Sequence, residues 1–472
     1  MSPTDGSDRE AVGGVWSRRP GLVVAALGSL TMLVVVVVVP ASVHRGSPPQ
    51  RSGESSPPPP TLSPVLPAVA AGLPPSPAGL RAALAAALRD AGLGAGAAAV
   101  VVDARSGRAL LSAGPADAVP PASTAKLVTA VAALARLGPR TRLETRLVAG
   151  VRSDSVILVG GGDPTLTGPG PPQAYPQPAR LADLAAGAAR QLVSAGLRRV
   201  QLSVDTSLFA GPATGPGWLP AYVTEGDVAP VSALEVDGGR VRPGGRERQP
   251  DPAVAAGRLF GRLLGRAGVS VVGPVTVGRA PSNAVPVSVV RSPPVAALVE
   301  RMLTDSDNDL AEALARLVAV HDGLPGSFAG AATALRRVVG ELGVDISALR
   351  LYDGSGLSKA DRLQPRVLTS LLSLAASPAH PELRAVITGL PVAGLTGTLV
   401  DRYAAPPVAG AAGVVRAKTG TLTGVSTLAG VTLDADGELL AFAFVAPAAP
   451  VRHGAEWALD RLAAVLAGCG CQ

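Results

Sequence analysis

Two side chains at the start of an apolar, Ala-rich run could act together as a nucleophile and its base. Ser123 follows Pro120 and Pro121, and Lys126 lies three residues further on. Three residues are close to one helical turn, so a helix places both side chains on one face. An amine among Ala, Leu and Val is poorly solvated, which favours its neutral form, and a neutral amine can take the proton of a neighbouring hydroxyl. The alternative is that Ser123 is only the N-cap of a core helix.

Lysine is rare in this chain, although positive charge is not. The 42 Lys and Arg residues include only three lysines, at positions 126, 359 and 418. Arginine stays protonated in proteins, so a lysine in an arginine-dominated chain is a candidate for a role that needs a titratable amine. The alternative is that chance left three lysines.

Two later stretches supply further polar residues. Ser306 and Asn308 precede a predicted helix, and the run Lys418-Thr419-Gly420-Thr421 lies on a predicted strand. Each stretch alone could be ordinary, one as a helix N-cap cluster and the other as a plain strand. In the order Ser-x-x-Lys, Ser-x-Asn, Lys-Thr-Gly, however, they match the three signatures of penicillin-recognising serine enzymes.

This chemistry gives each residue a role. Ser123 is expected to attack a carbonyl carbon and form an acyl-enzyme, with Lys126 as the base. Ser306 can relay a proton toward the leaving amine, while Asn308 can hold Lys126 and the substrate amide through the two ends of its side chain. Lys418 is expected to lower the proton affinity of Lys126 and to attract a substrate carboxylate.

The strand around Lys418 is expected to bind the substrate. Thr419 and Thr421 offer hydroxyls to the carboxylate, and Gly420 lets a peptide lie close against the strand. The backbone N–H groups of Ser123 and Thr421 are the expected oxyanion donors, worth roughly 3 kcal/mol each when preorganised.

At these residues the chain resembles the D-alanyl-D-alanine carboxypeptidase/endopeptidases of the low-molecular-mass class C penicillin-binding proteins. The resemblance extends over residues 78–470 and includes four further stretches, 160–166, 205–209, 353–358 and 391–398. It implies an α+β fold in which helices flank an antiparallel sheet, as in β-lactamase-like transpeptidases. The long separation of Ser123 and Ser306 resembles that family's large inserted β-rich region and exceeds the gap in class A β-lactamases.

Two expectations about specificity come from the resemblance alone. In relatives, an Asp of the inserted region reaches the free amine of a diaminopimelate-type side chain, which implies Asp205 here. The position corresponding to Lys359 is commonly Arg and binds that side chain's carboxylate. Lysine keeps the charge but loses the bidentate fork. The alternative for both residues is a solvated surface pair.

The function implied is that of a serine-type D-Ala-D-Ala carboxypeptidase or endopeptidase. It would act on peptidoglycan stem peptides through an acyl-enzyme on Ser123, without a cofactor, and β-lactams would inhibit it. A β-lactamase with the same acylation apparatus is an alternative, although no class A-type Glu is found and Ser306 stands where class C enzymes have Tyr. A non-catalytic cell-wall-binding protein is a further alternative.

Composition excludes other classes of function. Net charge is +7, but aromatic residues make up only 3% and the arginines are scattered, so the signature of nucleic-acid binding is missing. The four histidines lie far apart and predict no metal site. Cys469 and Cys471 are expected to be a terminal thiol pair, oxidised or free, and not a metal or catalytic site. A disulfide between them would have to close a very tight loop.

The N-terminal part predicts a membrane anchor. Residues 21–39 are uncharged and long enough to span a bilayer. Arg18 and Arg19 precede them, which puts the N-terminus in the cytoplasm and the catalytic part outside the cell membrane. Cleavage near Ala41-Ser42-Val43 would instead release a secreted protein. The expected segments are a cytoplasmic N-terminus 1–20, an anchor 21–39, a Pro/Ser-rich linker 40–77, catalytic parts 78–142 and 293–472, and an inserted region 143–292.

Periodicity and turn residues predict the elements that position these motifs. The expected helices are 80–91, the run from Ser123, 181–195, 295–304, 309–320, 331–342 and 454–467. The expected strands are 97–103, 109–112, 414–419, 426–433 and 438–445, with a series of short strands between 140 and 294.

Overall fold

The computed structural model describes residues 73–472, apart from 115–116 and 170–174. The described residues belong to one compact unit. The predicted anchor at 21–39 and most of the predicted linker lie outside the described residues. Among the helices that are described, none is both long and apolar enough to cross a bilayer.

An antiparallel five-stranded sheet joins the two ends of the described chain, in the order β2-β1-β11-β10-β9. Its strands are β1 (Ala98–Asp103), β2 (Ala109–Ala113), β9 (Arg416–Leu422), β10 (Val425–Leu433) and β11 (Leu439–Ala446). All five were predicted, with end points that differ by at most a few residues. Side chains alternate across β11, so that Phe442 and Phe444 face one core cluster while Ala441 and Ala443 face another. The sheet is therefore covered on both faces.

The first face is covered by α1 (Pro77–Leu84) and α11 (Arg452–Ala467). The predicted helix 80–91 is wrong in its second half, because α1 ends at Leu84 and two short 3₁₀ turns follow. Between these turns Asp90 leaves the helical region, accepts a hydrogen bond from Gly92 N and pairs with Arg461 of α11. Polar capping and an ion pair thus override the helical propensity of the alanines.

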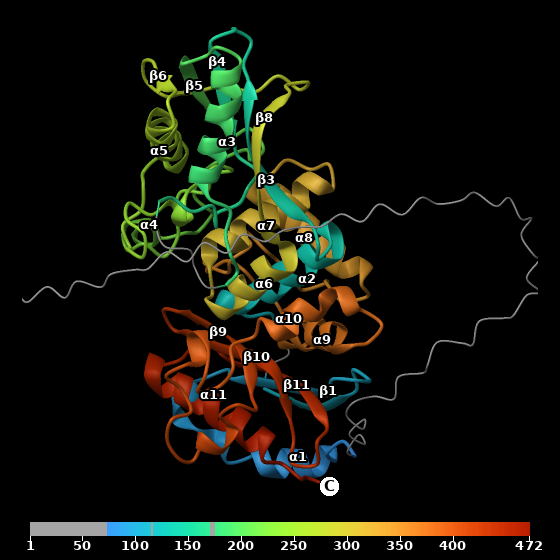
Figure 1. Ribbon diagram of the computed structural model, residues 1–472. Coiled ribbons are helices and arrows are strands. Elements are labelled where there is room, and N and C mark those ends of the chain that lie inside the picture. The colour runs from blue at the N-terminus through green and yellow to red at the C-terminus, as the bar shows by residue number, and fades with distance from the viewer. Residues whose placement is uncertain (1–72, 115–116, 170–174) are drawn as a thin grey trace, which may run out of the picture. The chain divides into compact units, whose positions relative to one another are not determined.

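A layer of helices covers the other face (Figure 1). It contains α2 (Lys126–Leu137), α6 (Val295–Thr304), α7 (Asn308–His321), α8 (Phe328–Glu341), α9 (Pro365–Ala376) and α10 (Arg384–Thr388). Every residue of α2 from Lys126 to Leu134 is buried, which explains its Ala-rich sequence. The helices α9 and α10 were not predicted.

A second, six-stranded sheet is built between α2 and α6, in the order β6-β5-β4-β3-β8 with β7 beside β5. Its strands are β3 (Arg142–Ala149), β4 (Ser155–Val159), β5 (Arg199–Asp205), β6 (Ser270–Val271), β7 (Thr276–Val277) and β8 (Pro286–Pro294). The helices α3 (Leu181–Ser194) and α5 (Pro252–Arg266) share its core, and the short α4 spans Ala221–Thr224. The sequence predicted α3 but missed α5, whose start is fixed by Pro252 and by the Asp251 cap on Val254 N.

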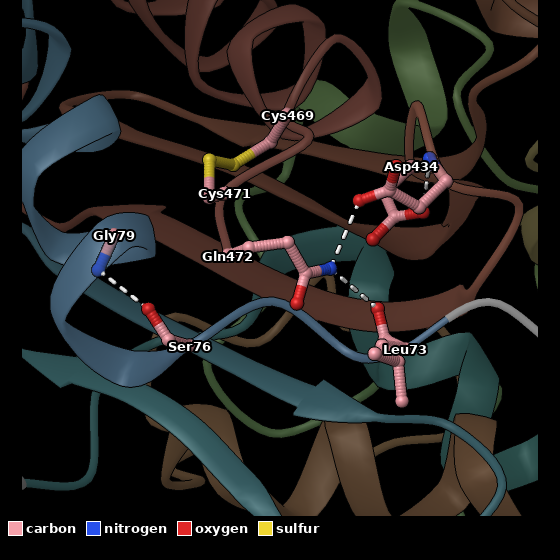
Figure 2. The surroundings of a disulfide bond; sticks show 8 residues. Leu73, Ser76, Gly79, Asp434, Cys469, Cys471 and Gln472 are labelled. Carbon is pink, nitrogen blue, oxygen red and sulfur yellow. Dashed lines mark hydrogen bonds between the residues drawn. A yellow bond between two sulfur atoms is a disulfide. The ribbon is translucent and has the colours of Figure 1, made fainter.

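A disulfide joins Cys469 and Cys471 at the C-terminus (Figure 2). The Cα atoms are 5.1 Å apart, which lies in the normal range for a disulfide. The backbone carbonyl of Cys471 accepts a hydrogen bond from Ser76 N at 2.7 Å, and Gln472 Nε2 donates to Leu73 O at 3.1 Å. The oxidised tail therefore lies against the segment that leads into α1.

Candidate active site

Ser123 and Lys126 meet as the spacing predicts, but on a 3₁₀ turn rather than within one α-helix. Ser123 belongs to the turn Ala122–Ala125, and Lys126 begins α2. Lys126 Nζ lies 3.0 Å from Ser123 Oγ. Ser123 caps neither element, since Pro121 and Ala125 occupy the two N-cap positions. Ala122 has φ of +48°, an unusual conformation for a residue with a Cβ, and such strain is found at functional turns.

The Lys126 amine has three acceptors among the described residues. Besides Ser123 Oγ, they are Asn308 Oδ1 at 2.6 Å and the carbonyl of Ser355 at 2.7 Å. The side chain is 0% exposed. Burial lowers the pKa of Lys126 to about 8, against the opposing pull of surrounding carboxylates, of which Asp353 contributes most. A neutral amine has two N–H groups, enough for Asn308 Oδ1 and the Ser355 carbonyl, and its lone pair can then accept the hydroxyl proton of Ser123.

Ser306 and Lys418 form a second contact beside the first. Lys418 Nζ donates to Ser306 Oγ at 2.9 Å and to its neighbour's carbonyl, Thr419 O, at 2.7 Å. Burial, followed by the charge of Lys126, holds the pKa of Lys418 well below its usual range. The charge of Lys126 therefore disfavours the charged form of Lys418. Ser306 has φ of +56°, so both serines lie at or beside strained backbone.

Asn308 uses both ends of its side chain, but only one as expected. Its Oδ1 contacts Lys126, whereas its Nδ2 donates to the backbone carbonyl of Asp227 at 2.9 Å. The next residue, Asp309, forms a buried ion pair with Arg248 at 2.9 Å. The inserted region thus holds the start of α7 in place, and the amide of Asn308 is already engaged without a substrate.

Gly420 brings β9 against the nucleophile turn. A Cβ added at this position would lie 2.2 Å from Thr427 Oγ1, 2.8 Å from Pro121 O and 3.0 Å from Ser123 N. The glycine is therefore required by packing within the protein, in addition to any approach of a peptide. Thr421 and Ser123 line one cavity, as expected for a pair of oxyanion donors, and Thr419 Oγ1 donates to Thr398 Oγ1 at 2.8 Å.

The cavity beside Ser123 has a volume of about 600 Å³. Its polar lining beyond the predicted residues comes from the inserted region and from the C-terminal part: Tyr222, Glu225, Asp227, Thr423, Ser426 and Arg452. A second cavity of about 420 Å³ lies beside Ser306. Asn308 and Asp227 line both cavities. Ser123 therefore lines one space that can hold ligand, and Ser306 lines the other.

The chain matches the model of one known protein family. The model of the D-Ala-D-Ala carboxypeptidase 3 (S13) family matches residues 80–251 and 246–466. The chain belongs to the S13 family. A carboxypeptidase of Mycobacterium tuberculosis is 39% identical over 417 residues, covering 86% of this chain and 87% of that protein. The carboxypeptidase DacB of Mycolicibacterium smegmatis is 39% identical over 409 residues, covering 84% of this chain and 85% of that protein.

The expected fold class is confirmed by a solved structure. Penicillin-binding protein 4 of Haemophilus influenzae superposes with a TM-score of 0.65 and 23% sequence identity, over 82% of this chain and 97% of that one. The S13 chain is therefore an α+β protein with the penicillin-recognising fold.

Two residues that the resemblance assigned to this S13 site lie elsewhere. Asp205 accepts hydrogen bonds from Ser207 N at 2.8 Å and from Ala280 N at 2.7 Å. It lines a separate cavity of about 710 Å³ in the inserted region, of which Ser123 is no part. Lys359 is exposed and lines neither cavity beside the serines. The local Asp-Thr-Ser pattern reflects a turn at the end of β5, where the carboxylate binds two backbone amides.

Sequence reasoning also missed residues that the fold brings to the site. Asp227, Glu225 and Tyr222 follow a Pro/Gly-rich loop without a pattern that singles them out. Glu312 had a usable signal, because it lies four residues after Asn308 on a predicted helix and so shares its face. It is fully buried and accepts hydrogen bonds from the amides of Gly354 and Ser355.

Proposed function

We propose that this S13 protein is a serine-type D-Ala-D-Ala carboxypeptidase or endopeptidase that forms an acyl-enzyme on Ser123. The observation that carries the proposal is the 3.0 Å contact between Ser123 Oγ and the fully buried amine of Lys126. Burial lowers the pKa of this amine to about 8, so a fraction of it is neutral near physiological pH and can serve as the base for a serine. The names of several relatives support the substrate class, since they are described as D-alanyl-D-alanine carboxypeptidases.

The contacts of Ser123, Lys126 and Ser306 support the following acylation steps. Lys126 takes the proton of Ser123 as the Oγ–C bond forms on the D-Ala carbonyl. The N–H groups of Ser123 and Thr421 bind the oxyanion of the tetrahedral intermediate. As the C–N bond breaks, the proton passes to the leaving amine by way of Ser306, whose hydroxyl lies beside Lys418. Water then hydrolyses the ester, releases the shortened peptide and restores the serine.

Lys418 binds the carboxylate of the substrate. Its amine is disfavoured as a cation in the empty site because it is buried beside Lys126. An anionic carboxylate at Thr419 and Thr421 would restore the charged form. The substrate therefore completes the electrostatics of the site, and a carboxylate-free peptide should be acylated poorly.

Recognition of the stem peptide falls to the cavity beside Ser123. Asp205 does not line it, whereas Glu225 and Asp227 do. Both lie on the loop after α4, and Tyr222 of α4 packs against Leu357 of the catalytic part. We assign the amine of a diamino-acid side chain to Glu225 and Asp227, and Arg452, which lines the same cavity, is available for a carboxylate.

We also propose that the protein acts outside the cell membrane. The substrate is a cell-wall peptide, and the uncharged stretch 21–39 after Arg18 and Arg19 supports an anchored, extracytoplasmic arrangement. Fractionation of cells that produce the full chain, with protease added to intact spheroplasts, tests this. Degradation of the catalytic part only from outside supports the proposal, and a protected soluble protein contradicts it.

Intact-protein mass spectrometry of the full chain after incubation with a penicillin tests the acyl-enzyme. We expect one added penicilloyl group, mapped to Ser123 and absent from Ser123→Ala. Ser194→Ala, at an exposed serine at the end of α3, is the matched control. An adduct on another serine contradicts the proposal. Loss of the adduct within seconds would instead support a β-lactamase. Related penicillin-binding protein 4 has been solved in complex with a β-lactam.

A further inference from the structure

Glu312 is a buried acid to which the reaction above gives no role. It lies on α7, one helical turn after Asn308, and is 0% exposed. A carboxyl group in such a place costs free energy unless its oxygens are bonded. Its partners therefore indicate what it does.

Glu312 and Lys126 hold the two sides of one backbone segment. Glu312 Oε1 accepts hydrogen bonds from Gly354 N at 3.0 Å and from Ser355 N at 2.8 Å. The carbonyl of Ser355 accepts from Lys126 Nζ at 2.7 Å, and the carbonyl of Gly354 accepts from Thr129 Oγ1 at 2.6 Å. One residue, Ser355, thus connects the carboxyl group to the amine that activates Ser123.

The segment has little room to move. A Cβ at Gly354 would lie 2.5 Å from Ala315 Cβ of α7, and one at Gly356 would lie 2.0 Å from the carbonyl of Ala122. Gly356 also has φ of +82°. The segment is therefore packed tightly between α7 and the turn that carries the nucleophile. A displacement of the Glu312 side chain would move the Ser355 carbonyl as well.

Most of the charged groups around Glu312 and Lys126 are carboxyl groups. Burial, followed by the charge of Asp353, raises the pKa of Glu312 to about 8, while the two amides and Arg316 act in the opposite direction. The charged groups that bear on Lys126 or Glu312 come from α7 and its cap, from the 353–361 loop and from β9: Asp307, Asp309, Arg316, Asp353, Asp361 and Lys418. The carboxylate of Asp353 accepts hydrogen bonds from Trp218 Nε1 and from the amides of Gly356 and Ser358.

We propose that Glu312 is a positioning residue for acylation: by binding the amides of Gly354 and Ser355, it keeps the Ser355 carbonyl in contact with the Lys126 amine. The inference rests on the proposed function, in which Lys126 is the base. The proton moves from Ser123 Oγ to Lys126 Nζ, and Glu312 forms no bond to the substrate. Its effect on the amine passes through the backbone of Ser355.

Two substitutions separate the hydrogen bonds of Glu312 from its ability to ionise. In Glu312→Gln, the side-chain carbonyl can still accept both amide hydrogen bonds, which converge on Oε1, but the group can no longer ionise. In Glu312→Ala, both bonds are lost. Glu438→Gln removes a buried carboxyl near the turn between β10 and β11 and is the matched control.

The measurement is the second-order rate of acylation by a reporter penicillin from pH 5 to 10, with thermal unfolding of each variant. Because Glu312→Gln can still make both amide hydrogen bonds, we expect it to keep an acylation rate close to that of the wild type below pH 8. Glu312→Ala should lose at least about tenfold in rate at every pH. The control should keep the wild-type profile. A folded Glu312→Ala at full rate, or a folded Glu312→Gln that loses as much rate as Glu312→Ala, overturns the inference.

Lysine NMR provides a readout that does not depend on turnover. The chain has three lysines, so ¹³Cε-labelled lysine gives three signals that single substitutions assign. We expect the Lys126 signal to titrate near pH 8 in the wild type, and at lower pH in Glu312→Ala, where the Ser355 carbonyl is no longer held on the amine. If Glu312→Ala does not fold, Glu312→Gln still decides, because a folded Glu312→Gln that has lost acylation although both amide hydrogen bonds can form overturns the inference. A wild-type Lys126 midpoint at its ordinary value, or failure of wild-type Ser123 to take up penicillin, would instead count against the proposed function.

Discussion

The side-chain amide of Asn308 donates a hydrogen bond to the backbone carbonyl of Asp227, 2.9 Å away. Asn308 also accepts from Lys126, so one side chain connects the base of the reaction to the inserted region. The insertion is thus part of the active site and not an appendage. The buried pair of Arg248 and Asp309 fastens the same junction one residue further along α7.

Breaking that junction should slow acylation as well as destabilise the fold. The Arg248 side chain is 2% exposed, and its loss leaves Asp309 buried without its ionic partner. Removing one partner of a buried ion pair costs about 3–5 kcal/mol. We expect Arg248→Met to lower the unfolding temperature and the rate of penicillin acylation together. Arg246→Met breaks an exposed pair with Asp227 and should cost less than about 1 kcal/mol. Equal effects of the two variants would contradict this account.

The pH dependence of acylation should follow the amine of Lys126. Burial lowers the pKa of Lys126 to about 8, and only the neutral amine can accept a proton. The rate should therefore rise with pH toward about 8 and fall about tenfold per pH unit well below it. Lys126→Arg cannot deprotonate and should lose about 10²–10⁴-fold in rate. A stopped-flow profile that is flat from pH 6 to 9 would rule out this base.

Gly420 should tolerate no side chain. A Cβ there would lie 2.2 Å from Thr427 Oγ1 and 3.0 Å from Ser123 N, so Gly420→Ala must push β9 away from the nucleophile turn. Overpacking of this kind costs about 1–3 kcal/mol. We expect a lower unfolding temperature and a loss of acylation, measured with a labelled penicillin. Gly265→Ala on α5, where a Cβ meets nothing within 4 Å, is the control and should leave both unchanged. A fully active Gly420→Ala would show that the oxyanion donors do not depend on this contact.

The C-terminal disulfide should matter little for stability and not at all for acylation. The bridge between Cys469 and Cys471 closes a very short loop, so it removes little conformational entropy from the unfolded chain. It should stabilise the folded protein by only about 1–2 kcal/mol. Replacing both cysteines by serine should therefore lower the free energy of unfolding by at most that amount. Chemical denaturation measures it, with reduction of the wild type as the parallel experiment. Loss of penicillin uptake after reduction would contradict the expectation.

Sequence reasoning predicted the catalytic centre better than the substrate pocket, for a physical reason. Ser123 and Lys126 are linked by local helical spacing, and Lys418 lies in a short Lys-Thr-Gly signature on a strand, so local rules place them. The contact of Asn308 with Asp227 joins residues far apart in the chain and depends on how a long loop folds back. The Asp-Thr-Ser pattern at Asp205 is local, but its carboxylate serves the backbone of its own turn. A local motif therefore identified a turn where the resemblance had implied a binding residue.

The preference for a diamino-acid side chain should depend on Glu225, not on Asp205. Glu225 is exposed in the cavity beside Ser123, whereas both oxygens of Asp205 are bonded to backbone amides away from it. We expect Glu225→Gln to reduce kcat/KM about tenfold for a stem peptide with a free side-chain amine, equivalent to about 1.4 kcal/mol of lost transition-state stabilisation. The same peptide with an acetylated amine is the control substrate and should be unaffected. Asp205→Asn should leave the ratio of the two substrates unchanged even if it destabilises β5. If Asp205→Asn abolishes the preference for the free-amine peptide and Glu225→Gln keeps it, the amine binds at Asp205 in the inserted sheet instead.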